Sequence, residues 1–510
     1  MIRFEVYDRD GPDKHWPLVN PYLLGPEEMP VKGRVTCRDG LIACEGPGGE
    51  ALALCTQFHA DTMGRLMLQT CLLAHRERPY VLSIELARHR IKMFIVKSEE
   101  WQMFDLSAEH PAMKHWEEAR RLFTEAITAD SSLLADQAGR LSLVHALEAS
   151  ERLALAHADV LLHRRFGARA ASSTALGVRI GPAIDAPKVR ELIKPEFDVI
   201  VVPLRWRDVE PAEGRFVFDA LDRWIDWAKD AGKPIVAGPL LDFSKESVPE
   251  WMNVWKHDYD AARDQAYDYL EHVVNRYKSV VGIWNVASGI NVNEHFEFTP
   301  DQMVDLVRMA VLHVRQSRKG ARTMVELARP FGEFRAANRD AVASLPFVDR
   351  LVQEGIRLDA LGVQILFGRN DRGMQTRDIM QVSALLDRFY WLELPILITA
   401  MGVPSANVDP QGGWWRHEWS ASTQSRWITQ VFAVSMSKPF VESVFWTDLV
   451  DHDDALLNGA GLITASGQLK PAFRRLCDVR RRLRKPLGRL KLPPRLNVES
   501  PIENDVDEPT

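Results

Sequence analysis

Apolar positions change their spacing along the chain, and the changes divide it into segments. Residues 1–108 show short β-prone runs between turn residues; the last two such runs cover 80–89 and 91–104. Asp39-Gly40 lies between two alternating runs, which is typical of a hairpin. In residues 109–170 apolar residues recur at helical spacing, with a capping break at 129–132. The pattern predicts a small β-rich module followed by a helical hairpin.

Residues 171–482 repeat one pattern, in which a short apolar run precedes a helical stretch. The predicted strands are 175–181, 198–204, 234–241, 280–286, 322–327, 358–366, 395–401 and 441–446. Eight such units close a parallel barrel. The predicted fold class is therefore α/β, a (β/α)8 TIM barrel preceded by the β-rich module and the hairpin. The tail, 483–510, is basic first and acidic last, contains several prolines, and is predicted to be disordered.

Composition restricts the possible partners. The chain has 46% hydrophobic and 26% charged residues and a formal net charge of -6, which argues against nucleic acid as a partner. It has no uncharged apolar stretch near the ~20 residues that span a bilayer. No secretory signal pattern is seen at the N-terminus, so we expect a cytoplasmic protein.

Cysteine and histidine positions raise the question of a metal site. The long, irregular spacing of the four N-terminal cysteines favours buried reduced thiols over a zinc site; they are Cys37, Cys44, Cys55 and Cys71. His145, His157 and His163 follow helical spacing beside Glu148 and Glu151 and are interpreted as polar surface positions rather than ligands. No metal or cofactor is predicted.

Five motifs occur in order through the barrel region. They are RWRDVEPAEGRFVF at 205–218, SVPEWM, WNVASG, LDALGVQILF, and finally VESVFWTDLVD with GLITASGQLKPAF. In this order they resemble the motifs of glycoside hydrolase family 10, the endo-β-1,4-xylanases, whose first motif reads K-W-x-x-x-E-P-x-x-G-x-F-x-F. The resemblance implies a barrel enzyme that hydrolyses glycosidic bonds with retention of the anomeric configuration. It implies two catalytic glutamates, one as acid/base and one as nucleophile.

The same resemblance places those two glutamates at the ends of strands four and seven, where this sequence has Gly289 and Ala400. Neither residue can donate a proton or attack an anomeric carbon. The supporting residues of the family differ as well, with replacements at Val201, Val202, Pro239, Phe243 and Leu366. The resemblance therefore predicts the architecture better than the activity.

Other residues are candidates for a remodelled site. Three strand-end carboxylates are the fallback catalytic candidates: Glu326, Asp242 and Asp448, with Asp451 and Glu294 also at strand ends. Four positions in the family motifs are predicted to bind substrate: Trp284, Asn285, Gln364 and Trp446. Trp414 and Trp415, near Trp419 in the loop after strand seven, either stack on a sugar or pin their own loop to the barrel.

Two functions follow from this balance. One is a divergent enzyme that binds and hydrolyses a glycan or glycoside with other carboxylates. The other is a non-catalytic scaffold that binds carbohydrate or protein. An ordinary xylanase is disfavoured. Glu294, five residues past Gly289, is a candidate for a shifted acid, but no acidic residue occurs in 396–408 to replace the nucleophile. A carbohydrate ligand is expected, and the sequence specifies no protein partner.

Overall fold

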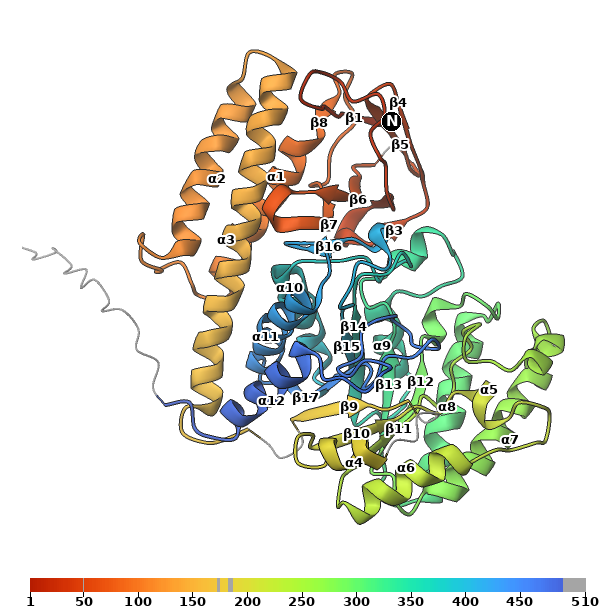
Figure 1. The fold of residues 1–510 in the computed structure, drawn as a ribbon. Coiled ribbons are helices and arrows are strands. Elements are labelled where there is room, and N and C mark those ends of the chain that lie inside the picture. The colour runs from red at the N-terminus through yellow and green to blue at the C-terminus, as the bar shows by residue number, and fades with distance from the viewer. Residues whose placement is uncertain (49, 172–174, 182–186, 489–510) are drawn as a thin grey trace, which may run out of the picture.

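A computed structural model describes residues 1–48, 50–171, 175–181 and 187–488, and its C-terminal part is a closed parallel barrel (Figure 1). The eight strands pair in chain order, and the last pairs with the first. They are β9 (Leu176–Arg179), β10 (Val199–Val202), β11 (Ile235–Ala237), β12 (Ile283–Ser288), β13 (Arg322–Leu327), β14 (Ala360–Leu366), β15 (Ile396–Gly402) and β17 (Val441–Trp446). The predicted barrel is confirmed. Six strands lie within their predicted runs, and β12 and β15 overlap theirs but end two residues and one residue later.

Helices surround the barrel. They are α4 (Pro187–Ile193), α5 (Trp206–Val209), α6 (Asp219–Asp230), α7 (Tyr259–Tyr277), α8 (Pro300–Ser317), α9 (Ser344–Gln353), α10 (Ile379–Phe389), α11 (Ala421–Ser437) and α12 (Pro471–Leu483). Thr299 and Asp378 form capping boxes that begin α8 and α10. Every residue of β10 and β11 is buried, as expected for parallel strands covered on both faces.

The N-terminal region contains two antiparallel-rich sheets. One has the order β4-β5-β1-β8, with β4 (Arg34–Arg38), β5 (Leu41–Glu45), β1 (Ile2–Glu5) and β8 (Tyr80–Val81). Asp39 and Gly40 turn the β4–β5 hairpin with φ of 50° and 78°, so this predicted hairpin is confirmed. The other sheet has the order β16-β7-β6-β2-β3, with β16 (Trp414–Trp415), β7 (Gly64–Gln69), β6 (Ala53–His59), β2 (Tyr22–Leu24) and β3 (Pro30–Val31).

The prediction of β-structure at 80–104 is largely wrong. Only Tyr80 and Val81 pair as a strand, and α1 (Leu82–Glu100) occupies most of the segment. Its buried positions, among them Leu82, Leu86, Arg90 and Phe94, are spaced by about one helical turn, and this periodicity outweighs the isoleucines and valine that favour strands. Helix α1 is followed by α2 (Pro111–Thr128) and α3 (Ser132–Phe166). These two helices form the predicted helical hairpin, which is confirmed.

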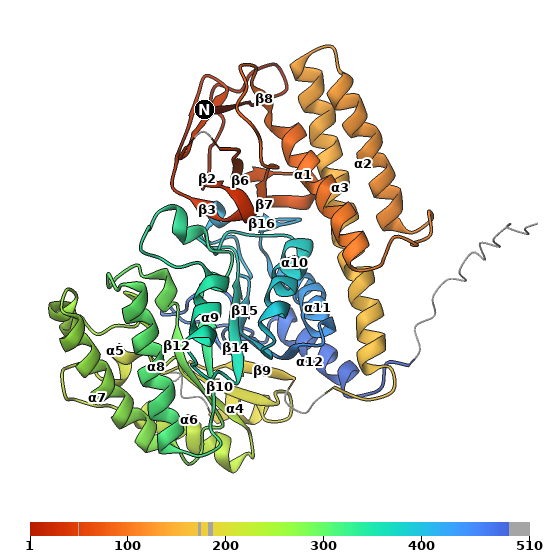
Figure 2. The same ribbon diagram turned by 180° about the vertical axis from the view of Figure 1, so that it is seen from behind.

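Helix α3 connects the two regions of the molecule. Along its 35 residues it packs against α1 and α2 and then against α10 and α11 of the barrel (Figures 1 and 2). A short strand of the barrel region, β16 (Trp414–Trp415), also joins the N-terminal sheet by pairing with Arg65 and Gly64 of β7. A Cβ at Gly64, which has φ of 98°, would lie 2.3 Å from the Trp414 carbonyl oxygen, so glycine is required for this pairing.

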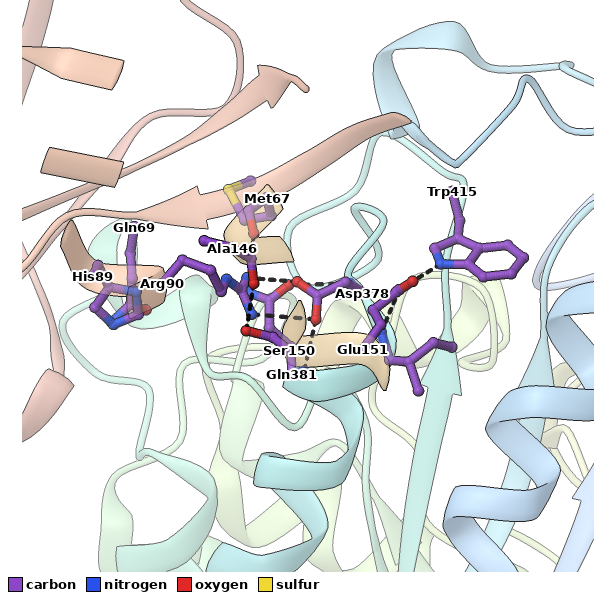
Figure 3. Close-up of polar contacts among 11 residues, drawn as sticks. Met67, Gln69, His89, Arg90, Ala146, Ser150, Glu151, Asp378, Gln381 and Trp415 are labelled. Carbon is purple, nitrogen blue, oxygen red and sulfur yellow. Dashed lines mark hydrogen bonds and ion pairs between the residues drawn. The ribbon is translucent and has the colours of Figure 1, made fainter. Parts of the chain in front are cut away.

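The residues between the N-terminal region and the barrel include buried ions (Figure 3). Arg90 of α1 lies 2.5 Å from the Asp378 carboxylate, and both side chains are at most 3% exposed. Glu151 of α3, fully buried, accepts hydrogen bonds from the Trp415 indole at 2.6 Å and the Ile379 amide at 3.1 Å. Because a buried charge without a partner is costly, these contacts fix how the two regions meet.

Residues 489–510, most of the tail predicted to be disordered, lie outside the described residues. Within the described part of the chain, no helix has both the length and the apolar character needed to cross a bilayer.

Replacing Arg90 tests this junction. Arg90→Met leaves the buried Asp378 carboxylate without its cation, so we expect the free energy of unfolding to fall by about 3–5 kcal/mol in a denaturant titration. Arg88→Met on the same helix is the matched control, because Arg88 is 46% exposed in its pair with Glu85 and should cost at most about 1 kcal/mol. Equal losses in the two variants would contradict the role given to the buried pair.

Candidate functional site

A cleft of about 1190 Å³ opens at the carboxyl ends of the barrel strands. Residues that end or follow all eight strands line it, including Arg179 after β9, Asp242 after β11 and Asp448 after β17. This is the end of a (β/α)8 barrel at which loops from successive strands converge. The cleft is therefore the candidate functional site.

Glu326 lies at the centre of a three-strand cluster. Its side chain is 3% exposed at the end of β13, and its Oε1 accepts hydrogen bonds of 2.6 Å from Ser288 Oγ and from Gln364 Nε2. Ser288 ends β12 and Gln364 lies in β14, so a donor reaches the carboxylate from each neighbouring strand. Sequence reasoning singled out Glu326 and Gln364 but not Ser288, whose only signal was its place at the end of a strand.

Asp242 is held beside this cluster in a turn after β11. Its carboxylate accepts hydrogen bonds from the Ser244 amide at 2.9 Å and from Ser247 Oγ at 2.7 Å. Burial raises the pKa of Asp242 above its ordinary 3.8, and the charge of Glu326 acts in the same direction, while the serine donors oppose the rise. Asp242 is thus a lining carboxyl group that keeps its proton to higher pH than usual.

The other predicted carboxylates are engaged in ion pairs. Asp448 lines the cleft, is 6% exposed and lies 3.4 Å from His452 Nε2. Asp451 binds Lys470 at 2.6 Å, and Glu294 binds Arg329 at 2.7 Å. Of the three fallback catalytic candidates, Asp242 and Glu326 accept short hydrogen bonds from serine and glutamine side chains. Asp448 lies beside an imidazole and accepts a longer hydrogen bond, of 3.4 Å, from Thr447 Oγ1.

The two positions matched to the family's glutamates carry no functional group. Gly289 follows the fourth barrel strand with φ of 59°, and a Cβ there would lie 3.2 Å from Ala328 Cβ. Ala400 in the seventh strand is fully buried, and it packs in an apolar cluster with Leu366, Met374, Leu457 and Ala460. A carboxylate at position 400 would therefore lie among apolar side chains.

Three of the tryptophans predicted to bind substrate are buried. Trp284, Trp415 and Trp446 are at most 1% exposed, so none offers a free ring face to a sugar. The Trp446 indole donates to the Ala460 carbonyl at 2.7 Å, and Trp419, in the same loop as Trp415, donates to the Gly413 carbonyl at 2.8 Å. These rings pack the barrel and pin the loop, which was the alternative left open for the cluster.

The remaining substrate-binding candidates fall in different places. Gln364 lines the cleft. Asn285 is 3% exposed and is absent from the described lining of the cleft. Trp414 is half-buried and lines a separate cavity between the N-terminal sheet and α3.

The metal-site alternatives have no geometric support. Among the described residues, no group of three or more His, Cys, Asp or Glu is placed to hold a metal ion. Burial raises the pKa of the Cys44 and Cys55 thiols to about 12. His157 was predicted at the surface but is 8% exposed and stacks on Trp101; burial lowers its pKa to about 3.

The fold and cleft define the C-terminal region as a (β/α)8 barrel with a polar, carboxylate-lined site at its loop end. A family model described as glycosyl hydrolase family 10 matches residues 168–479, more than half of the chain. The chain therefore belongs to glycosyl hydrolase family 10, a family with a carbohydrate-active fold.

Curated relatives are xylanases matched over shorter stretches. Endo-1,4-beta-xylanase A of Xylanibacter ruminicola is 25% identical over 194 residues, which cover 36% of this chain and 51% of the relative. Endo-1,4-beta-xylanase 2 of Claviceps purpurea is 31% identical over 113 residues, which cover 22% of this chain and 32% of the relative. The chain thus spans about half of the first relative's length and about a third of the second's.

Solved structures of similar fold are also xylanases. Xylanase 10B from Thermotoga petrophila RKU-1, in complex with xylobiose, aligns with a TM-score of 0.47 at 15% identity and covers 63% of this chain and 96% of its own. Native xylanase 10B from Thermotoga maritima aligns with a TM-score of 0.46 at 16% identity and covers 61% and 95%.

The raised pKa of Asp242 predicts a pH-dependent stability difference. The folded state binds this proton more tightly than the unfolded state, so the stabilisation is complete below about pH 3.8 and is lost as the pH rises through the folded-state pKa. Asp242→Asn removes the buried charge and keeps an acceptor for the Ser244 amide. We expect the variant to be more stable than wild type at pH 7 and equal to it near pH 3, by urea denaturation.

Asp264→Asn, an exposed position on α7, is the control and should show no such trend. A constant difference between Asp242→Asn and wild type across the pH range would contradict the raised pKa.

Proposed function

We propose that the protein binds a carbohydrate in the barrel cleft without performing the retaining hydrolysis of its family. The observation that carries this proposal is the packing at Ala400, where apolar side chains fill the position that the resemblance assigns to the nucleophile. Gly289 at the matched acid/base position supplies no proton donor either. A double displacement needs both groups, so the family reaction has no chemical basis at these positions.

The cleft nevertheless offers groups that recognise sugar hydroxyls. Carboxylates accept hydrogen bonds from hydroxyl groups, and the Gln364 amide both donates and accepts. Glu326, Asp242 and Gln364 line the same cleft, and its volume of about 1190 Å³ exceeds the ~300–1,000 Å³ of usual small-molecule sites. Because the curated relatives are endo-1,4-beta-xylanases, β-1,4-linked xylo-oligosaccharides are the first ligands to test.

Calorimetric titration of the full chain with xylotriose to xylohexaose tests the binding function. We expect a measurable Kd, weakened about 2- to 10-fold in Gln364→Ala, which loses a neutral hydrogen-bonding group. Gln353→Ala, on the outer helix α9, is the matched control and should bind as wild type does. Absence of heat with these ligands and with a wider panel of neutral oligosaccharides would overturn the proposal.

A second candidate function is inverting hydrolysis, with Asp242 as the acid and Glu326 as the base. Its support is the raised pKa of Asp242, because a general acid must hold its proton at the working pH. β11 and β13 are separated only by β12. Two strand spacings amount to about 9–10 Å, close to the ~6.5–9.5 Å between the carboxyl groups of inverting enzymes.

Product stereochemistry distinguishes this second candidate. If the pair is catalytic, proton NMR during turnover of an aryl glycoside or xylo-oligosaccharide will show the anomer opposite to the substrate's. Asp242→Asn and Glu326→Gln will each lower kcat by about 10²- to 10⁴-fold, whereas the exterior variant Gln353→Ala will not. Product of retained configuration, or undiminished turnover in both variants, would exclude the pair, and a complete lack of turnover would leave binding as the function.

A further inference from the structure

A second cavity, of about 500 Å³, lies outside the barrel cleft. Its walls come from the N-terminal loop through Trp16, from strands β6 and β7, from α3 through Arg140, and from the barrel region through Trp414. This volume lies within the ~300–1,000 Å³ range of small-molecule sites. The cavity exists only because β16 pairs with β7 and brings Trp414 to the N-terminal sheet.

One row of side chains crosses three strands at this cavity. Arg65 of β7 pairs with His59 of β6 on one side and with Trp414 of β16 on the other. Residues directly opposite in an antiparallel pair project from the same face of the sheet. In agreement, the His59 and Trp414 ring centroids are 5.9 Å apart, and the Arg65 guanidinium carbon is 5.9 Å from the Trp414 ring. An imidazole, a guanidinium and an indole therefore face the cavity together.

The two lining arginines differ in their partners. Arg140 is committed to the protein, since it donates to Asp136 at 2.6 Å and to the Tyr7 carbonyl at 2.7 Å. Arg65, half-buried, forms no ion pair with any residue of the described chain. Two more lining donors, Trp16 Nε1 and Gln57 Nε2, are buried and without a hydrogen-bond partner in the described structure. The cavity thus presents unused donors and the charge of Arg65, and the exposed Asp61 carboxylate also lines it.

We propose that this cavity binds a carboxylated sugar, a uronic acid residue of an oligosaccharide. A guanidinium binds a carboxylate with two parallel hydrogen bonds, and Arg65 supplies one whose charge is not neutralised by the protein. The C–H face of a pyranose ring packs on an indole, and Trp414 and Trp16 supply two half-buried indoles. Trp16 Nε1 and the Gln57 amide donate to the sugar's ring and hydroxyl oxygens. This site is distinct from the cleft and does not depend on the function proposed for it.

A pair of ligands that differ in the charge and methylation of their carboxyl groups tests the proposal. Digalacturonic acid and its dimethyl ester are titrated into the full chain, followed by calorimetry and tryptophan fluorescence. We expect the acid to bind at least about tenfold more tightly than the ester, since the ester cannot form the charge-assisted hydrogen bonds with Arg65. Equal affinity, or no binding of either ligand, would overturn the proposal.

Variants locate the binding. Arg65→Gln should abolish the preference for the acid, while Arg38→Gln, an exposed arginine on β4, should keep it. Gln364→Ala in the barrel cleft should also keep it, and loss of the preference there would place the ligand in the cleft and refute the second site. Inorganic phosphate at millimolar concentration should not displace the acid. Displacement would show a general anion site instead of a carboxylated-sugar site.

Discussion

The arrangement of the whole molecule depends on one buried carboxylate, Glu151. It lies near the middle of α3 with no exposed surface, and burial raises its pKa while Arg416 opposes the rise. A carboxylate buried in this way needs hydrogen-bond donors from the residues that pack against it. They come from the Trp415 indole, the Ile379 amide and the Arg416 guanidinium, which donates at 2.6 Å. All three belong to the barrel region, so one residue of the helical hairpin fixes the first turn of α10 and the loop after β15.

This constraint explains where the tryptophans of that loop lie. The Trp415 indole donates a hydrogen bond to Glu151, and the adjacent Trp414 pairs with Arg65 at the edge of the N-terminal sheet. Trp419 closes the loop on itself through the Gly413 carbonyl. The loop that follows the seventh barrel strand thus serves the junction between the two regions. None of its indoles lines the barrel cleft, whose described lining combines carboxylates and arginines with apolar side chains such as Phe243, Phe296 and Phe298.

The local parts of this structure were predictable from the sequence, and the long-range parts were not. Apolar runs bounded by turns identified all eight barrel strands, since buried parallel strands have that pattern. Residues 80–104 were predicted as strands because isoleucine and valine favour strands. The helical spacing of Leu82, Leu86 and Phe94 was the weaker signal in the sequence. The burial of Trp415 could not be predicted, because its partner Glu151 is 264 positions away and both residues are polar or amphipathic.

The candidate site shows the same division. Glu326 and Asp242 were recognisable because strand-end positions of a barrel converge, a rule that needs only strand assignments. Gln364 was recognised from its place in a motif that resembles the family's. The burial of Trp284 and Trp446 could not be predicted, because a resemblance fixes position along a strand but not the depth at which a side chain packs. In this barrel Ala400, Leu366 and Met374 form an apolar cluster beside the seventh strand, and Gly289 takes a left-handed conformation after the fourth. The two carboxyl groups that follow β11 and lie in β13 accept hydrogen bonds from Ser247, Ser288 and Gln364. These donors come from the loop after β11, from β12 and from β14, so the geometry around the two carboxyl groups depends on neighbouring strands and could not be derived from any one segment.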